Sequence, residues 1–540
     1  MNDLRRDEES FDVLVVGFGP AGATAAGILG RMGHRTLVVD RLEGIYEKPR
    51  AIALDHEIFR HFDNMGIAEA VVPHVAPFTA SQHFGAEGQL IRRIDMVPEP
   101  YPLGYTPSLV FTQPPVEAEL RRHAQSFPSV TVEMGVELVG LSDRGGHVEA
   151  RLRGGDGGSR TVRARYVLGC DGASSSVREL AGIRLEDLIF DEPWLVVDVL
   201  VDDLGLAKLP QTSAQFCNPA RPTSFVMGPK NHRRWEIMLL PGEDPRRMEQ
   251  PDQVWALLAP WLEPTDGTLW RAAAYRFHAL VADDWRRGHI LIAGDAAHQQ
   301  PPFFGQGMCQ GLRDVTNVLW KLDRVLRGAS DEALLDTYTA ERKQHVIELT
   351  GKIKAVGRSI CERDPEAARR RDAQVLAEGG GAALTITRQE IIPPLRDGFI
   401  AGEDAPARGT LFVQPHIKAA AGWQLLDRVA GAGWRVILDG RRVAPGSVGS
   451  LPAGLGDVVV KAVAPPDLAS AGQDLLIERD GVLADWFDRH GVVGALIRPD
   501  HYVFGAARSV SELTGLIEEA ARRLVPDPAL AGAPARRAAG

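Results

Sequence analysis

The pattern of apolar and polar positions predicts alternating strands and helices at the start of the chain. Residues 11–16 form a short apolar run, residues 20–32 have helical spacing, and residues 36–39 form a second apolar run. Short apolar runs bounded by glycine or polar residues favour buried strands, whereas longer periodic segments favour helices. The segment therefore predicts a strand, a helix and a second strand, an order that is typical of a parallel sheet.

A glycine-rich turn joins the first predicted strand to the helix. Gly17, Gly19 and Gly22 form a G-x-G-x-x-G pattern, and Asp40 ends the second strand 18 residues after Gly22. In such a pattern the first glycine permits a tight turn, the second lets the backbone approach a pyrophosphate, and the third lets helix and strand pack closely. Asp40 is placed to bind a ribose hydroxyl. The pattern predicts a dinucleotide site, and its alternative is an ordinary glycine-rich turn.

A second candidate site lies much later in the chain. Residues 290–293 predict a strand and residues 309–326 predict a helix, and the loop between them contains Asp295, Gly305 and Gly307. An aspartate at a strand end can accept hydrogen bonds from a sugar or ribityl hydroxyl, and free N–H groups at a helix start can hold an anion. This combination suits a flavin, because a flavin has a polyol chain and a ring that becomes anionic on reduction.

A third motif follows the apolar run at residues 162–168. Asp171, a glycine turn, three serines and Arg178 occur in close succession. An arginine and loop N–H groups suit a pyrophosphate. A plain Asp-Gly turn before a capped helix is the alternative, and the motif becomes specific only together with the other two.

The rest of the chain divides by composition. Residues 181–280 contain apolar runs separated by polar loops, which predict an antiparallel sheet. Residues 331–400 have mostly helical spacing and include many charged residues, and the glycines at 379–381 predict a break. A new pattern of strands and helices begins near residue 402, and the tail from Val525 has a composition that predicts disorder. The apolar runs that predict strands in this last part are 410–413, 434–438, 457–463 and 491–497.

Composition narrows the classes of function. A chain of 540 residues predicts two or three domains, and a net charge of -10 with a pI of about 5.9 argues against a nucleic-acid partner. The chain has no basic block that would favour a membrane surface, and its first ten residues lack the apolar core of a secretory signal, so a cytoplasmic protein is expected. The four cysteines form no C-x-x-C pair and no metal-ligand spacing occurs, so neither a disulfide framework nor a metal site is expected.

Together, the motifs at residues 17–22, 171–178 and 294–302 resemble those of the class A flavoprotein aromatic hydroxylases, in order and in spacing. Two further segments, at 190–199 and 305–314, resemble the 3-(3-hydroxyphenyl)propionate hydroxylase group of that family. The resemblance covers roughly the first two thirds of the chain and is looser beyond that.

The resemblance implies an α/β fold: a Rossmann-like FAD-binding domain with an antiparallel β-sheet substrate domain, a helical connection and a C-terminal thioredoxin-like domain. The expected boundaries are 1–180 for the FAD-binding domain (with part of the substrate domain at about 76–104), 181–280 for the β-sheet substrate domain, 281–400 for completion of the FAD-binding domain and helices, and 401–540 for the thioredoxin-like domain. Because this last domain lacks C-x-x-C, a packing or dimer-supporting role is expected there instead of a redox role.

The resemblance also implies roles for individual residues. The cofactor-binding residues would be Gly17, Gly19, Gly22, Asp40, Arg50, Gln113, Asp171, Asp295, Gly305, Gly307, Met308 and Cys309. Cys309 would contribute its backbone N–H and not its thiol. The catalytic candidates are Pro302, in an apolar wall beside the flavin ring, and His298 and Tyr275, which together with His278 are candidates for the group facing the phenol hydroxyl. The candidate cations for a substrate carboxylate are Arg221, Lys230, Arg233, Arg234 and Arg276.

The implied activity is hydroxylation of a phenolic substrate with FAD, NADH or NADPH, and O₂, through a flavin C4a-hydroperoxide. The preferred substrate is a small meta-hydroxyphenyl acid such as 3-(3-hydroxyphenyl)propionate, and a homodimer is the candidate assembly. The alternatives are a hydroxylase of larger polycyclic or polyketide aromatics, a flavin oxidoreductase that inserts no oxygen, and a non-catalytic FAD-binding protein. In the hydroxylases water must be excluded, because the activated oxygen otherwise ends as hydrogen peroxide.

Overall fold

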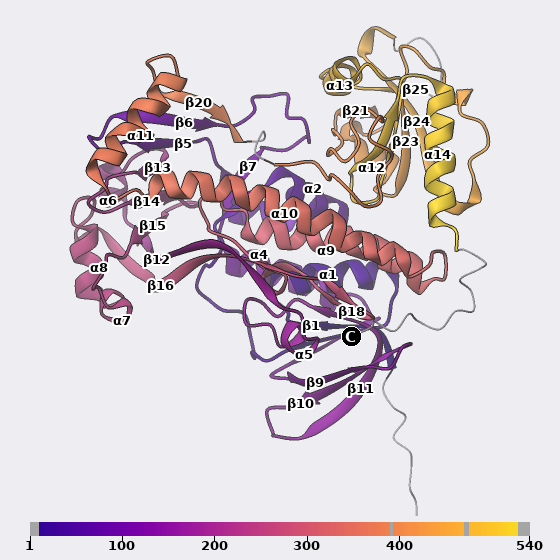
Figure 1. The fold of residues 1–540 in the computed structure, drawn as a ribbon. Coiled ribbons are helices and arrows are strands. Elements are labelled where there is room, and N and C mark those ends of the chain that lie inside the picture. The colour runs from indigo at the N-terminus through magenta and orange to yellow at the C-terminus, as the bar shows by residue number, and fades with distance from the viewer. Residues whose placement is uncertain (1–9, 389–391, 469–474, 527–540) are drawn as a thin grey trace, which may run out of the picture.

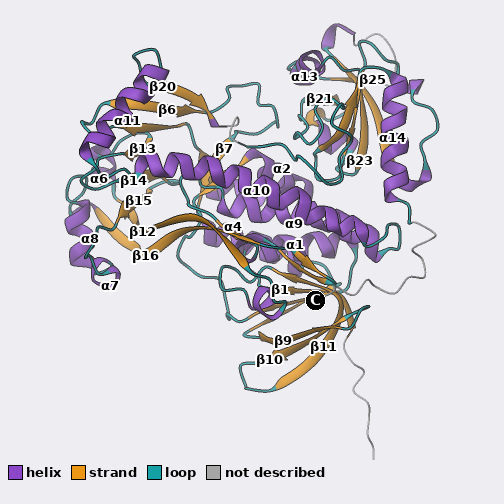
Figure 2. Cartoon of the chain, in the orientation of Figure 1, coloured by secondary structure: helices purple, strands orange, loops and turns teal. Residues whose placement is uncertain are grey.

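The computed structural model describes residues 10–388, 392–468 and 475–526. In these residues three main β-sheets are combined with helices (Figures 1 and 2). Two sheets belong to the main body, and the third lies in a separate C-terminal lobe. None of the described helices is long and apolar enough to cross a membrane.

The first sheet carries the glycine-rich turn. Its strands are β17 (Arg286–Arg287), β18 (Ile290–Ile292), β11 (Ser159–Gly169), β1 (Ser10–Val16), β2 (Thr36–Asp40) and β8 (Val130–Met134) in that order, with β10 (Val148–Arg153) on β11 and β9 (Glu137–Asp143) on β10. The pairs among β18, β11, β1, β2 and β8 are parallel. Parallel strands covered on both faces read as continuous apolar runs, and Val13, Leu14 and Val15 on β1 are fully buried. Helices α1 (Pro20–Met32), α4 (Gln113–Gln125) and α9 (Gly307–Leu326) pack together beside this sheet.

The second sheet is mostly antiparallel and draws strands from distant parts of the chain. Its order is β19 (His298–Gln299), β16 (Gly267–Ala282), β12 (Leu185–Val201), β15 (His232–Met238), β14 (Thr223–Met227), β13 (Ser213–Phe216), β5 (Ala80–Phe84), β6 (Leu90–Asp95) and β20 (Leu384–Thr387). Side chains alternate between the two faces of a strand. One face, with Leu195, Val197 and Trp235, packs against α8 (Pro251–Leu258) in an apolar core. The opposite face is free to line a cavity.

Two long helices connect the body to the C-terminal lobe. Helix α9 packs along α10 (Ala333–Ile360), and both run through the middle of the molecule (Figure 1). Leu349 and Ile353 of α10 pack into an apolar cluster with Phe303 and Phe304, which lie just before α9 in the chain. The helices therefore support the loop that the sequence analysis singled out.

The C-terminal lobe has its own sheet and core. The strand order is β25 (Leu475–Ile477), β24 (Val458–Ala464), β23 (Trp434–Asp439), β26 (Gly494–Ile497) and β27 (Val503–Ala507), with helices α12 (Leu426–Ala430), α13 (Val482–His490) and α14 (Val510–Leu524). The β23–β24 and β24–β25 pairs are parallel, and β26 is antiparallel to both of its neighbours. Phe412, Ile437 and Trp486 form part of a separate core. The thioredoxin-like interpretation of this lobe stays a prediction.

Buried ion pairs join the lobe to the body. Arg60 on α2 (His56–Met65) donates two hydrogen bonds to Asp427, at 2.7 and 2.8 Å, and neither side chain is exposed. Arg498 pairs with Glu341 of α10 at 2.7 Å, again without exposure. Although burial by itself would raise the pKa of Asp427, the charge of Arg60 holds it well below the ordinary range. The junction is thus a polar interface that was assembled from residues far apart in the sequence.

The remaining elements are short. They are β3 (Ala53–Asp55), β4 (Val75–Pro77), β7 (Ser108–Phe111), β21 (His416–Ala419), β22 (Gly422–Leu425), α3 (Ala68–Val71), α5 (Ser176–Leu180), α6 (Asp203–Lys208), α7 (Pro245–Met248) and α11 (Pro365–Glu378), with 3₁₀ turns at Val72–His74, Pro264–Asp266, Gly294–Ala296, Pro445–Ser447, Ala453–Leu455 and Pro466–Leu468.

Some sequence predictions need correction. The expected strand at 410–413 is only an isolated bridge between Leu411 and Tyr502. The described part of region 331–400 contains the expected helices, α10 and α11, and in addition the strand β20, which pairs with β6. Most of the tail that was predicted to be disordered, residues 527–540, lies outside the described residues.

Candidate active site

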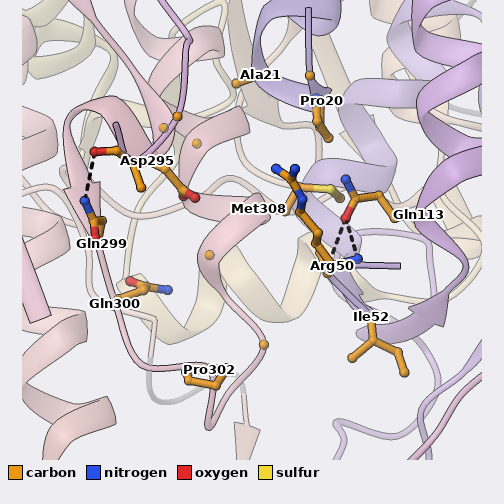
Figure 3. A pocket seen from close by; sticks show the side chains of 18 of the residues that line it. Pro20, Ala21, Arg50, Ile52, Gln113, Asp295, Gln299, Gln300, Pro302 and Met308 are labelled. Atoms are coloured by element: carbon orange, nitrogen blue, oxygen red, sulfur yellow. Dashed lines mark hydrogen bonds between the residues drawn. The ribbon is translucent and has the colours of Figure 1, made fainter. Parts of the chain in front are cut away.

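A cavity of about 560 Å³ lies between the strand ends of the first sheet and the free face of the second. Asp295, Gln299 and Gln300 lie on one side of it, and Arg50, Gln113 and Met308 lie on the other (Figure 3). The predicted site residues that line it are Gly17, Gly19, Asp40, Arg50, Gln113, Asp171, Tyr275, Asp295, Pro302, Gly305, Gly307 and Met308. Gly22, His298 and Cys309 do not line it.

The three glycines of the first motif have different structural roles. Gly17 has a φ of +96°, and a Cβ built on it would lie 2.4 Å from the carbonyl oxygen of Cys170. A Cβ on Gly22 would lie 1.9 Å from the carbonyl oxygen of Gly17. Gly19 differs, because a Cβ there meets no atom within 4 Å. Gly17 and Gly22 therefore allow close packing of the turn, and Gly19 keeps the backbone open to the cavity.

Helices α1 and α9 begin at the cavity and lack a side-chain cap. The N-cap residues are Gly19 for α1 and Gln306 for α9, and neither provides a capping hydrogen bond. The Gln306 amide oxygen instead accepts a hydrogen bond from Arg313, at 2.9 Å. The first N–H groups of a helix need partners, and the helix dipole makes them suitable for an anion. The two helix starts can therefore hold the pyrophosphate and the anionic edge of a reduced flavin.

Two aspartates are placed to accept hydrogen bonds from the hydroxyl groups of a ligand. Asp40 already accepts hydrogen bonds from the backbone N–H groups of Phe18, at 2.7 Å, and Leu42, at 2.8 Å, and these bonds fix its orientation. Asp295 faces the cavity, and among the described residues none donates a hydrogen bond to its carboxylate. The surrounding protein raises the pKa of Asp295 by desolvation. Asp295 is exposed to the cavity, and the ribityl hydroxyls of a flavin would supply the hydrogen-bond donors that its carboxylate lacks.

The segment around Arg50 is fixed from two sides. The Gln113 side-chain oxygen accepts hydrogen bonds from the backbone N–H groups of Arg50, at 3.2 Å, and Ala51, at 2.7 Å. Arg234 donates to the carbonyl oxygens of Pro49 and Arg50, at 3.1 and 2.8 Å. Gln113 and Arg234 thus place the backbone at Arg50, whose exposed side chain reaches the cavity.

The third motif orders the loops and leaves few donors for a phosphate. Asp171 accepts hydrogen bonds from the Ser175 hydroxyl, at 2.5 Å, and from the Val177 N–H, at 3.1 Å. Arg178 is buried and donates to the carbonyl oxygens of Ala173 and Ala296. These two hydrogen bonds connect the third motif to the loop of Asp295. Arg178 does not line the cavity, so it does not face a pyrophosphate there.

The loop before α9 is held by buried residues. The Arg388 guanidinium donates to the carbonyl oxygen of Phe304. Arg313, which binds Gln306, also pairs with Asp55 and with Glu57, and Glu57 accepts a hydrogen bond from Tyr502 of the C-terminal lobe at 3.0 Å. Burial raises the pKa of the Cys309 thiol, which fits a small buried residue and not a reactive one.

These features fit FAD. The open position at Gly19, the uncapped helix starts, the oriented Asp40 and the carboxylate of Asp295 can serve a pyrophosphate, a ring, a ribose and a ribityl chain, respectively, and all of them lie at one cavity. No group of His, Cys, Asp and Glu that could hold a metal ion occurs among the described residues.

The free face of the second sheet forms the other half of the cavity. Strand register places His83, Gln215, Ser224, Glu236 and Val196 in one row across neighbouring strands. A second row contains Arg234, Asp198 and Arg271. The apolar part of the cavity comes from Phe277, Phe303, Phe304, Pro302 and Ile94. This face can hold an aromatic ring against an apolar wall with its polar edge on the first row.

The candidates for the phenol-facing group occupy different surroundings. His298 is buried, bonds Asp314 at 2.7 Å and stacks on Trp285, so its ring serves packing. His278 lines the cavity and lies 3.6 Å from Asp191. Tyr275 lines the cavity, and its hydroxyl accepts a hydrogen bond from Arg271.

Of the five candidate cations, Arg234 and Arg276 line the cavity, and both have acidic partners. Arg221 pairs with Glu243 and Arg276 with Asp191, while Arg233 donates to backbone carbonyls. Lys230 does not line the cavity, and Arg234 is held by Asp198 and by the segment at Arg50.

Four residues that line the cavity were not predicted from the sequence: Glu236, His83, Gln215 and Arg388. Burial raises the pKa of Glu236 to about 7, and burial with the charges of Arg92 and Arg371 lowers the pKa of His83 to about 3. A glutamate inside the predicted strand near 235–240 was a detectable signal. His83 and Arg388 carried none, because only the pairing of distant strands brings them to this face.

Known proteins resemble the chain over most of its length. A family model described as "FAD binding domain" matches residues 10–352, and one described as "HcaD C-terminal domain" matches 409–522. A probable NADH-specific resorcinol 4-hydroxylase of Rhodococcus jostii (strain RHA1) is 36% identical, with 97% of each chain covered. A 3-(3-hydroxy-phenyl)propionate/3-hydroxycinnamic acid hydroxylase of Mycobacterium sp. (strain JLS) is 33% identical, covering 93% of this chain and 90% of the relative.

Solved structures share the fold. The flavin-dependent monooxygenase PieE in complex with FAD and substrate has a TM-score of 0.78 at 22% identity, covering 95% of this chain and 99% of that one. A ternary complex of aklavinone-11 hydroxylase with FAD and aklavinone has a TM-score of 0.76 at 23% identity, covering 97% and 100%. The chain belongs to the FAD-binding family whose model it matches, and it is an FAD-dependent aromatic hydroxylase.

Proposed function

We propose that the protein hydroxylates a small phenol that carries a second polar group meta to its hydroxyl, using NADH and O₂. The observation that carries the proposal is the continuous cavity, which joins the FAD-binding residues to a sheet face with a polar row beside an aromatic wall. The names of two relatives support the substrate class, because resorcinol and 3-(3-hydroxyphenyl)propionate are both meta-substituted phenols.

The protein's part in this reaction is to bind, orient and exclude water. When bound, FAD would take two electrons from the nicotinamide and activate O₂, so that one oxygen atom enters the ring and the other leaves as water. Asp40, Asp295 and the starts of α1 and α9 would hold FAD. Pro302 and its neighbouring phenylalanines would keep water from the reacting oxygen. Tyr275 would face the substrate from β16.

The sheet face could accept either a neutral diphenol or a phenol with an acidic side chain, and the role of Arg388 would distinguish the two. A neutral diphenol needs no cation, whereas an acidic side chain would favour a guanidinium. Arg388 lines the cavity and among the described residues has one hydrogen-bond acceptor, the Phe304 carbonyl, although its ring contact with Phe78 also holds it. The proposal therefore includes Arg388 as the cation for a substrate carboxylate, if the substrate is the acid.

The experiment is to measure NADH and O₂ consumption by the FAD-loaded protein with resorcinol, with 3-(3-hydroxyphenyl)propionate and with a polycyclic polyphenol. Stimulation by one small phenol, with a product heavier by one oxygen atom, is the expected result. Arg388→Gln should raise KM for the acid alone. Hydroxylation of only the polycyclic compound would contradict the proposal. Homodimer formation and a cytoplasmic location rest on the sequence, and size-exclusion chromatography tests the first.

A further inference from the structure

Glu236 is an ionisable residue that lines the cavity and has no proposed role in binding FAD. It lies on β15, is 6% exposed and lines the cavity. No described residue donates a hydrogen bond to its carboxylate. Burying a carboxyl group without a donor costs free energy. A ligand that brings a donor into the cavity would remove that cost.

The charged groups that face Glu236 are already engaged with one another. Arg234, on the same strand, donates to Asp198 of β12 and to the backbone carbonyls at 49–50. Arg271 of β16 also donates to that backbone segment and lies 3.7 Å from Asp198. The positive charges of both arginines favour an ionised Glu236, whereas the negative charge of Asp198 opposes it. None of the three provides a hydrogen bond to the Glu236 carboxylate.

The neighbours of Glu236 suit the edge of an aromatic ring. Across β14 and β13 its row continues with Ser224, whose hydroxyl donates to Gln215 at 2.5 Å, and ends on β5 at the neutral imidazole of His83. On the other side, Val196 of β12 belongs to the apolar cluster that includes Phe277 and Phe303. A phenol ring on the apolar side would thus direct its hydroxyl groups to the polar row.

We propose that Glu236 is a catalytic residue: its carboxylate accepts the hydrogen bond of the substrate's phenolic hydroxyl and takes that proton as the ring is hydroxylated. This inference rests on the proposed function and identifies the residue that performs its proton transfer.

Atoms and electrons are conserved in the hydroxylation step. After O₂ has taken up two electrons from NADH, a ring carbon ortho or para to the hydroxyl gives an electron pair to one of its oxygen atoms. The new C–O bond forms as the O–O bond breaks, and the second oxygen keeps the electron pair of that bond and leaves as water. The electron pair of the phenolic O–H bond becomes the second C=O bond, and the proton moves to Glu236. The substituted carbon then loses its hydrogen as a proton, and the carbonyl oxygen regains one, which restores the aromatic ring. NADH, one proton and O₂ are consumed, and NAD⁺ and water are released.

The acidity of the carboxyl group fits this role. Burial raises the pKa of Glu236 to about 7, with Arg234 acting against the rise. A general base works best when its pKa lies near the operating pH, and such a base typically contributes about 10²–10⁴ in rate. Perturbed carboxyl groups in clefts are also more frequent at functional sites.

The test compares Glu236→Gln, Glu236→Asp and a control, Glu186→Gln, in FAD-loaded protein. Glu186 also lies on the second sheet but is half exposed and pairs with Lys343. Three quantities are measured with the phenol that the wild-type protein hydroxylates: kcat/KM as a function of pH, the affinity for the phenol without NADH from the flavin absorbance change, and the thermal midpoint of the protein without FAD.

We expect kcat/KM of the wild-type protein to rise up to about pH 7 and then level off, since its base must be ionised. Glu236→Gln should lower kcat by about 10²–10⁴-fold and abolish this rise, with a smaller change in phenol affinity. Glu236→Asp should be slower but should keep the pH dependence, and Glu186→Gln should match the wild-type protein. Because folding raises the pKa of Glu236 from 4.5 to about 7, the stability of the fold falls as the pH rises from about 4.5 to about 7. Glu236→Gln should therefore melt higher than wild type at pH 8 and equally at pH 4.

Three outcomes would overturn the inference. If Glu236→Gln hydroxylates at the wild-type rate with the wild-type pH profile, the proton acceptor lies elsewhere and the proposed function stands. If only phenol affinity falls and kcat is unchanged, Glu236 binds the hydroxyl without taking its proton. If the wild-type protein itself hydroxylates no phenol, the proposed function fails, and this inference fails with it.

Discussion

Gly19 offers a direct test of where the FAD pyrophosphate binds. It precedes α1 with a φ of -70°, and a Cβ built on it meets no atom within 4 Å. The protein without FAD should therefore accept Gly19→Ala without strain. Because Gly19 lines the cavity, the added methyl group would occupy space that the cofactor needs. FAD affinity should fall while the stability of the apoprotein stays the same.

The magnitude follows from the contact that is lost. A hydrogen bond between a backbone N–H and a charged phosphate contributes about 1.5–3 kcal/mol. At about 1.4 kcal/mol for each factor of ten, the Kd for FAD should rise about 10- to 150-fold. Gly22→Ala gives the opposite pattern, because its Cβ would lie 1.9 Å from the Gly17 carbonyl oxygen. Overpacking of this kind costs about 1–3 kcal/mol of apoprotein stability.

The assay pairs an FAD titration, followed by quenching of flavin fluorescence, with thermal melting of each apoprotein. Gly351→Ala on α10 is the control, because a Cβ there also meets no atom within 4 Å and Gly351 lies outside the cavity. The reasoning would be refuted if Gly19→Ala bound FAD as tightly as the wild-type protein, or if its apoprotein melted as low as that of Gly22→Ala.

Three further predictions concern polar groups of the cavity and of the contact between the lobe and the body. Asp295→Asn should weaken FAD binding yet raise the melting midpoint of the apoprotein at pH 7. Desolvation raises the pKa of Asp295, so its ionisation costs stability, and the increase in melting midpoint should shrink as the pH falls to about 4. Asp427→Asn leaves the guanidinium of Arg60 buried without its charge partner, so denaturation should show a loss of about 3–5 kcal/mol at neutral pH; a loss under about 1 kcal/mol would contradict this. Tyr502→Phe removes the hydrogen bond to Glu57, worth about 1 kcal/mol, and FAD titration should show a Kd a few-fold higher if the lobe helps to hold the loop before α9.

The fold class and the cofactor could be predicted from the sequence because their signals are local. Gly17, Gly19 and Asp40 act through the turn and strand in which they stand, and their spacing survives in any structure that contains that unit. The same holds for Asp295 at the end of its strand. Family and structural comparisons confirm the FAD-dependent aromatic hydroxylase and the mixed α/β fold. The roles of the individual site residues remain proposals.

The substrate half of the cavity could not be predicted in the same way. Alternation along β15 shows that Glu236 and Arg234 share a face, but not which face meets the cavity. His298 is a similar case: its position beside the flavin loop made it a candidate, and only the fold shows that its ring bonds Asp314. Arg388 reaches the cavity because β20 pairs with β6, almost 300 residues earlier in the chain.

The sequence by itself determined the two helix starts, the glycines that open them and the aspartates that accompany them, because each depends on neighbours within one turn or strand. Only the tertiary structure decided which polar groups face the substrate and which serve packing. Arg178 and Arg234, both placed by sequence near a ligand, are saturated by backbone carbonyls and by Asp198. Glu236 has no hydrogen-bond donor within the described part of the chain. Whether a charged side chain has a partner is a property of the segments that meet around it, and some of those segments are more than 100 residues apart in the chain, as Arg178 and Ala296 are.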